Sequence, residues 1–143
     1  MLHIDRITHD LGGQAILGHA ILSSWDLFNL VHQGIPAEAA EYVLETGTLT
    51  KHEFNRLISP ERTYMRRLKE KKLSFEESDK LIRFARIRAF ASSVLGEDKE
   101  ADAWLREPNI MLHDARPLDM LDSDSGAQLV ENLLGRIAHG IPS

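Results

Sequence analysis

One segment of the sequence has the composition of a polyanion-binding element. Six of the residues from Ile58 to Lys72 are Arg or Lys and two are acidic, in a chain of 143 residues with a formal net charge of -5. Residues 51–88 carry twelve basic and six acidic side chains, whereas residues 1–50 carry one and six and residues 89–143 carry four and ten. This local reversal of sign favours a nucleic acid as partner for the middle region and other partners for the acidic regions.

Other groupings of reactive residues lack an essential member. The stretch GQAILGHA has the glycine spacing of a phosphate-binding loop, but His19 and Ala20 stand where Lys and Ser or Thr are needed. The stretch DSDSG has its glycine one position too early for a calcium loop, and Leu133 replaces the bidentate Glu; we expect it to cap a helix instead. The seven histidines include no pair four residues apart. We therefore expect no metal, no cofactor and no catalytic residue.

The elements that position the basic segment are expected to be helices. Apolar residues recur at three- and four-residue spacing, and strand-type alternation is scarce, so the fold class predicted is all-α. Two capping boxes, Thr50 with Glu53 and Ser74 with Glu77, mark helix starts. Trp25 and Trp104 lie in apolar stripes and are expected in the core. Helices are predicted at residues 24–32, 36–47, 50–58, from 59 onward, 74–96, around 101–105 and at 127–140, with a short turn of helix at 117–121.

The basic segment forms the second of two closely joined helices. Ser59 and Pro60 separate them, because the residue before proline leaves helical geometry and proline fits the first helical turn. Two such helices are typical of a helix-turn-helix, whose second helix enters the major groove of DNA. With Ser59 as the cap, Tyr64 or Met65 would turn inward with Leu68. The residues then left for bases and phosphates are Arg62, Thr63, Arg66 and Arg67, and Lys69 would lie beside the DNA backbone.

Two considerations leave the reading face open at this point. A basic run on a helix is in many proteins only a solvated face, and the turn lacks the glycine found in many helix-turn-helix units. One such helix makes few phosphate contacts, so a monomer would bind weakly and a homodimer is expected.

The acidic carboxyl-terminal region has an ordered set of features: Trp104-Leu105, Pro108-Asn109, Leu112, Pro117-Leu118, Leu121, Gly126, Val130, Leu133, Arg136-Ile137 and Gly140. This order resembles the toxin-binding domain of the Xre/ParS/MbcA antitoxins. Upstream, the stretches ISPERTYMRRL, LSFEESDKLIRFARI and VLGEDKEADAWL are similar to the Xre-type helix-turn-helix of the same family. The resemblance covers residues 24–143.

The resemblance implies an antitoxin of the RES-Xre type. Such a protein binds and neutralises a RES-domain toxin, an enzyme that consumes NAD, and represses its own operon by binding operator DNA. The carboxyl-terminal segment would then cover the active site of the toxin, and a tail stiffened by Pro142 would lose little entropy on binding. A packed helix with a fraying tail is the alternative. The toxin-binding residues implied are Arg136, His139, Gly140, Ile141, Pro142 and Ser143.

The expected organisation is an extension (1–23), a helix-turn-helix DNA-binding body (24–107) and a small helical toxin-binding domain (108–143). The extension could be an arm, a dimer contact or disorder. The chain has no cysteine, no signal-peptide pattern and no apolar run of membrane-spanning length, so we expect a cytoplasmic protein without a membrane partner. The alternatives are a stand-alone dimeric transcription regulator and, from another class, a small helical enzyme.

Overall fold

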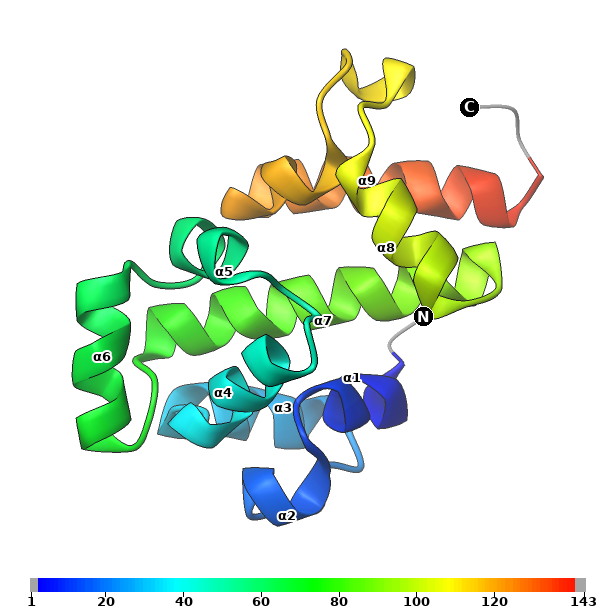
Figure 1. Ribbon diagram of the computed structural model, residues 1–143. Coiled ribbons are helices and arrows are strands. Elements are labelled where there is room, and N and C mark those ends of the chain that lie inside the picture. Colours follow the sequence, from blue (N-terminus) through cyan, green and yellow to red (C-terminus); the bar gives the residue numbers. More distant parts are fainter. Residues whose placement is uncertain (1–2, 141–143) are drawn as a thin grey trace.

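The computed structural model describes residues 3–140, which fold into helices and their connections (Figure 1). No strand occurs in this range, and the prediction of an all-α fold is confirmed. The elements are α1 (Ile4–Asp10), α2 (Gly13–Leu17), α3 (Ser24–Gln33), α4 (Ala37–Glu45), α5 (Lys51–Leu57), α6 (Glu61–Glu70), α7 (Phe75–Leu95), α8 (Asp98–Arg106), the 3-10 turns η1 (Ile110–Leu112) and η2 (Pro117–Asp122), and α9 (Asp124–Ala138).

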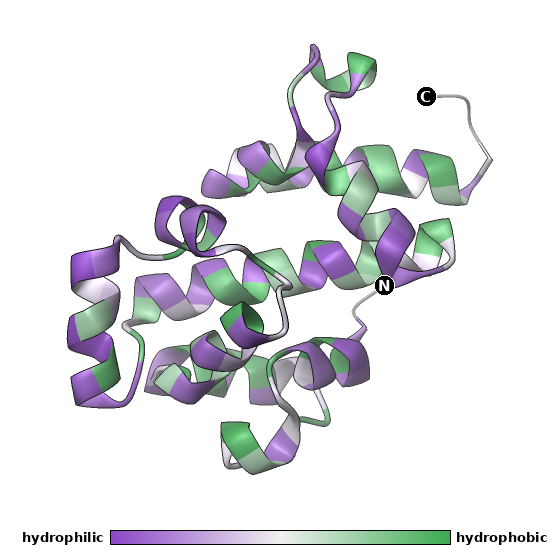
Figure 2. Cartoon of the chain, viewed as in Figure 1, coloured by the Kyte–Doolittle hydropathy of each residue, from purple (hydrophilic) through white to green (hydrophobic). Residues whose placement is uncertain are grey.

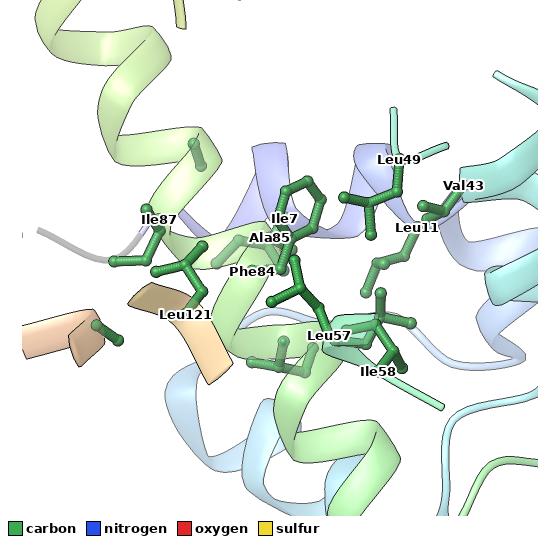
Figure 3. Packing of buried hydrophobic residues seen from close by; sticks show 14 of the residues in the cluster. Ile7, Leu11, Val43, Leu49, Leu57, Ile58, Phe84, Ala85, Ile87 and Leu121 are labelled. Atoms are coloured by element: carbon green, nitrogen blue, oxygen red, sulfur yellow. The ribbon is translucent and has the colours of Figure 1, made fainter. Parts of the chain in front are cut away.

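Helix α7 is the central element of the fold. In Figure 1 it runs across the molecule, with α1 and α3 packed on one side and α8 and α9 on the other. Its buried residues cover more than half of the helix circumference, as expected for a helix that packs against neighbours on both sides. In Figure 3, Phe84 and Ala85 of α7 lie among Ile7 of α1 and Leu57 of α5. The amino-terminal and carboxyl-terminal parts therefore share one core.

Residues 4–17 contribute to this core. Ile7 and Leu11 at α1 and Leu17 at the end of α2 are buried. The guanidinium group of Arg88 in α7 lies 3.3 Å from the carboxylate of Asp10, and its Nε donates to Asp102 of α8 at 2.8 Å. These ion pairs compensate the buried charges of Arg88 and Asp10. Of the three roles left open for the extension, neither an independent arm nor disorder fits residues 4–17, which form α1 and α2 and pack against the core.

Two tryptophans were expected in the core, and for Trp25 this prediction was wrong. Trp25 is 67% exposed, whereas Trp104 packs against the core from a half-buried position. Helix α3 starts at Ser24 and turns its other apolar residues inward, which leaves Trp25 and Phe28 on the outer face. Ring centroids follow one another at 5.0 Å from Trp25 to Phe28, 4.0 Å to His32 and 4.9 Å to Phe75 of α7. We call these four residues the aromatic ladder.

The carboxylate of Glu77 holds the junction of α5, α6 and α7. It accepts hydrogen bonds from the Ser59 hydroxyl (2.7 Å), Arg67 Nε (2.7 Å) and the Ser74 backbone N–H (2.8 Å). The last bond completes the predicted capping box of α7, and the box of α5 is confirmed as well. Burial alone would raise the pKa of Glu77, but these donors outweigh it and hold the pKa below its ordinary value of 4.5.

Ser59 was expected to cap α6, and this prediction was wrong. The N-cap position is Pro60, which offers no side-chain acceptor, and the hydroxyl of Ser59 donates to Glu77 instead. The turn before α6 is thus held from α7. The backbone N–H groups of the first turn of α6 gain nothing from a side-chain cap.

A Glu77→Gln substitution should destabilise the fold by about 1–2 kcal/mol at pH 7, because a neutral amide replaces a buried acceptor of charge-assisted hydrogen bonds. Because the folded pKa of Glu77 is depressed, its contribution is complete above about pH 4.5 and is lost as the pH falls through the folded pKa. The difference in unfolding free energy between the wild type and the variant should therefore shrink between pH 6 and pH 3 in urea titrations.

The matched control is Glu76→Gln, which removes one charge from the exposed neighbouring position. It should cost a few tenths of a kcal/mol at pH 7. Equal losses in the two variants would contradict the role assigned to Glu77.

Candidate functional site

The two helices expected to form a helix-turn-helix are α5 and α6. Tyr64 of α6 turns inward, and its ring meets Phe54 of α5 edge-on at 4.9 Å. Met65, the other candidate for this position, is exposed. Leu68 packs against the core from a partly buried position, as expected. The side-chain amide of Asn55 donates to the backbone carbonyl of Ser59 at 3.0 Å and so fixes the turn that joins the helices. No residue between α5 and α6 has a positive φ, so this turn does not require a glycine.

The outer face of α6 carries a stripe of cationic side chains. Arg62, Arg66 and Lys69 are exposed and are spaced four and three residues apart, which places them along one side of the helix. Thr63 lies beside the stripe in a half-buried position. Four of the five residues proposed for DNA from the sequence thus lie together. We call Arg62, Arg66 and Lys69 the basic stripe.

Arg67 faces the body of the protein. Its side chain is 19% exposed, its Nε donates to Glu77 at 2.7 Å, and its Nη1 donates to Glu70 at 3.0 Å. The hydrogen bond to Glu77 is the main cause that raises the pKa of Arg67 above its ordinary value. The guanidinium group of Arg67 therefore positions α6, and the basic stripe faces outward without it.

Helix α9 has one face in the core and one face outside. Ser123 caps it by accepting from the backbone N–H of Gly126 at 3.0 Å, as expected from the DSDSG stretch. A Cβ atom at position 126 would meet the carbonyl oxygen of Met120 at 2.0 Å, so only glycine allows this close approach. The residues of the inner face are buried: Ala127, Val130, Leu133 and Leu134.

The outer face of α9 leads to the predicted toxin-binding residues. Leu129, Asn132, Arg136 and His139 are exposed and follow one another at three- and four-residue spacing. The structure therefore brings Arg136 and His139 onto one surface, and Gly140 follows it. The other three residues expected to bind the toxin lie outside the described residues: Ile141, Pro142 and Ser143.

The turn η1 is a feature that the sequence reasoning did not assign to a site. Ile110 and Met111 are exposed, and Leu112 alone of the three residues is buried. Three consecutive apolar residues in a region predicted to be a loop could have indicated a binding surface. Only one of the three side chains is needed to anchor such a turn.

Ion pairs join the helix-turn-helix to the carboxyl-terminal part. Arg106 at the end of α8 binds Glu53 through two hydrogen bonds of 2.9 Å. Burial alone would raise the pKa of Glu53, but Arg106 and the Thr50 backbone lower it overall. Arg86 of α7 pairs with Glu131 of α9 at 2.7 Å, and Asp119 of η2 pairs with Arg56 of α5. These ion pairs fix the outer face of α9 and the basic stripe of α6 on one set of packed helices.

Nothing in residues 3–140 suggests a catalytic metal site, because no group of three or more His, Asp or Glu side chains is arranged to hold an ion there. None of the helices in the same range combines the length and the apolar character that a membrane crossing needs.

Comparison with known proteins identifies both parts. Residues 26–86 match the family described as the antitoxin Xre-like helix-turn-helix domain, and residues 91–140 match the antitoxin Xre/MbcA/ParS C-terminal toxin-binding domain. A protein named antitoxin Xre from Photorhabdus laumondii is 34% identical over 117 residues, which cover 80% of this chain and 79% of the relative. An antitoxin Xre from Pseudomonas putida is 33% identical over 121 residues, which cover 84% and 76%.

A third relative, antitoxin Xre from Yersinia enterocolitica, is 29% identical over 119 residues, which cover 82% of this chain and 74% of that protein. The two matched families correspond to the surfaces described above: the helix-turn-helix holds the basic stripe, and the toxin-binding domain holds α9 and η1. The chain belongs to the Xre family of antitoxins, with a helix-turn-helix domain and a toxin-binding domain.

Proposed function

We propose that this antitoxin neutralises an NAD-degrading RES-domain toxin and represses its own operon by binding operator DNA. The observation that carries this proposal is the presence of two separate exposed surfaces on one framework: the basic stripe on α6, and the outer face of α9 in a region of acidic composition. A cationic helix suits phosphates, and a surface in a region of net negative charge suits a protein partner better than a nucleic acid. Because its proposed target is operator DNA, we place the protein in the cytoplasm.

The basic stripe is proposed to contact DNA through bases and phosphates. Arg62 lies in the first turn of α6, the part of a recognition helix that reaches base edges, with Thr63 beside it. Arg66 and Lys69 follow along the same side and suit phosphates. Arg67 contributes by holding α6 against Glu77, so it is a positioning residue in this proposal.

The outer face of α9 and the residues after it are proposed to cover the active site of the toxin. The exposed side chains of Arg136 and His139 lie on the face that leads toward Gly140, which has a left-handed φ of 71°. This conformation does not continue the helix. In this proposal the catalytic chemistry belongs to the toxin, and the antitoxin itself is not an enzyme. The alternative is a dimeric transcription regulator without a toxin partner.

The working form is proposed to be a homodimer joined at the aromatic ladder. The connection between α3 and α4 is bonded to the connection between α6 and α7. The backbone N–H of Leu73 donates to the carbonyl of Ile35 at 2.8 Å, and the N–H of Ala37, the first residue of α4, donates to the carbonyl of Lys71 at 3.1 Å. The ladder therefore lies close to the reading helix. A two-fold contact sets each patch against itself, and ring faces meet without the repulsion that like charges would cause.

The exposed area of the ladder supports this assignment. Trp25, Phe28 and Phe75 are each about half exposed or more, and full aromatic side chains present about 150–250 Å². Together they offer roughly 300 Å² on each protomer, which would be the apolar centre of an interface of ordinary size. A hollow of about 240 Å³ beside Phe28 and Phe75 could receive a ring from the second copy.

The double substitution Arg62→Ala with Arg66→Ala should weaken binding to the promoter DNA of the gene roughly tenfold or more at physiological salt. Because two phosphate or base contacts are lost, the slope of log affinity against log salt should fall by up to about 2. Fluorescence anisotropy at several salt concentrations measures both. The control Lys80→Ala with Lys99→Ala removes two positive charges elsewhere; equal effects of the two pairs would remove α6 as the reading helix.

The Trp25→Glu substitution should convert a dimer into a monomer, because a two-fold contact would set two carboxylates against each other. Sedimentation velocity gives the mass, and the same variant should bind promoter DNA more weakly. Leu129→Glu, an exposed apolar position on α9, should remain dimeric. A Trp25→Glu variant that sediments as the wild type does would contradict the proposed dimer contact.

Co-expression with the product of the adjacent gene tests neutralisation. The full chain should co-purify with that protein and preserve cellular NAD, whereas a chain ending at Gly140 should bind it but leave NAD depleted. If neither version binds the product or alters NAD, the transcription regulator without a toxin partner becomes the better account.

A further inference from the structure

Two apolar side chains project from the carboxyl-terminal part without a structural role. Ile110 is 81% exposed and Met111 is 40% exposed, although both belong to a 3-10 turn in an ordered connection. Figure 1 shows this turn at the outer end of a protruding hairpin between α8 and η2, and Figure 2 shows hydrophobic residues in it. Leu112 is buried and attaches the turn to the body. Exposing the other two side chains to water contributes nothing to the stability of the fold.

The hairpin that carries this turn is held firmly by its own hydrogen bonds. The side chain of Asn109 accepts from the backbone N–H of Met111 at 2.9 Å, and its backbone carbonyl accepts from Asp114 at 2.9 Å. The N–H of Asn109 donates to the carbonyl of Ala115 at 3.0 Å, which closes the hairpin. His113 and Asp114 both have left-handed φ values, 56° and 66°. Two non-glycine residues in this region are uncommon and require such support.

The base of the hairpin is fixed to the rest of the molecule. Arg116 donates to Asp119 of η2 through two hydrogen bonds, of 3.0 and 2.8 Å, and Asp119 also pairs with Arg56 of α5. The hydrogen bond from Arg116 is the main cause that lowers the pKa of Asp119. An exposed apolar turn on a fixed support loses little conformational entropy when a partner covers it, which favours tight binding.

We propose that Ile110 and Met111 form an apolar anchor that inserts into a pocket of the cognate toxin. This inference rests on the proposed function, since it names a second contact in the toxin interface, separate from the outer face of α9. Both residues lie inside the range matched to a toxin-binding domain. Exposed Glu107 and Asp114 flank them, so the pocket of the toxin should be apolar with a basic rim.

A second copy of this chain is a poorer occupant of the anchor than the toxin. A two-fold contact through the turn would bring Glu107 and Asp114 close to their own copies, and like charges across an interface are unfavourable. The charge pattern therefore assigns the anchor to a partner of different composition.

The test is the Ile110→Asp variant of the full chain, with Leu22→Asp as its matched control. Leu22 is 79% exposed and lies before α3, so the two changes add the same charge at equally exposed apolar positions. Affinity for the purified product of the adjacent gene is measured by calorimetry, and promoter binding and mass by sedimentation are measured in parallel. Ile110→Asp should weaken toxin binding roughly 30-fold or more, as for a hot-spot residue.

In the same variant, promoter binding and mass should stay as in the wild type, and Leu22→Asp should bind the toxin normally. Toxin affinity within about twofold of the wild type for Ile110→Asp overturns the anchor while the proposed function stands. A loss of dimer mass in Ile110→Asp overturns it in favour of a second copy. Failure of the wild-type chain to bind the product overturns the proposed toxin partner itself, and the anchor with it.

Discussion

The carboxylate of Glu77 fixes three segments at one point: the turn before α6, α6 itself and the start of α7. Its negative charge is buried and is compensated by three donors, so the position of α6 depends on the protonation and geometry of a single side chain. Arg67 binds Glu77 and therefore faces the body of the protein, where it is not accessible to DNA. The ion pair sets the rotation of α6, and so the direction in which the basic stripe faces.

Glu53 repeats the arrangement of Glu77 on the neighbouring helix. Each glutamate occupies the third position of a capping box, and each also binds an arginine from another element, Arg67 for Glu77 and Arg106 for Glu53. A local helix-start signal thereby becomes a tertiary contact. The bond of Glu77 connects α6 to α7, and the bond of Glu53 connects α5 to the end of α8. The DNA-binding and toxin-binding parts are aligned by the same kind of bond.

Many of the positive charges in residues 51–88 act within the fold. Arg56, Arg67, Arg86 and Arg88 pair with acidic side chains of other elements, so the cationic surface is narrower than the composition indicates. The basic stripe remains because its members point away from the body.

Local patterns in the sequence predicted the all-α class, both capping boxes and the helix-turn-helix, because these depend on residues a few positions apart. Predictions failed where a distant contact decides the outcome. Ser59 has the residue type of a cap, yet its hydroxyl serves Glu77, eighteen positions away. Helices α1 and α2 have seven and five residues, too short to show a period, and they owe their order to packing. The exposure of Trp25 could have been predicted, because the predicted helix began at Ser24 as α3 does, and the spacing of the buried Leu27, Leu30 and Val31 places Trp25 on the opposite side.

The continuity of α7 also bears on how the protein is degraded. The match to the helix-turn-helix domain ends at residue 86, and the match to the toxin-binding domain begins at residue 91. Both positions lie within α7. No exposed linker is present there for a protease to cut, and cleavage requires that α7 open together with the core around it. Proteolytic removal of the antitoxin would therefore eliminate both domains in one event. Under the proposed function, release of the toxin and loss of repression would then begin at the same moment.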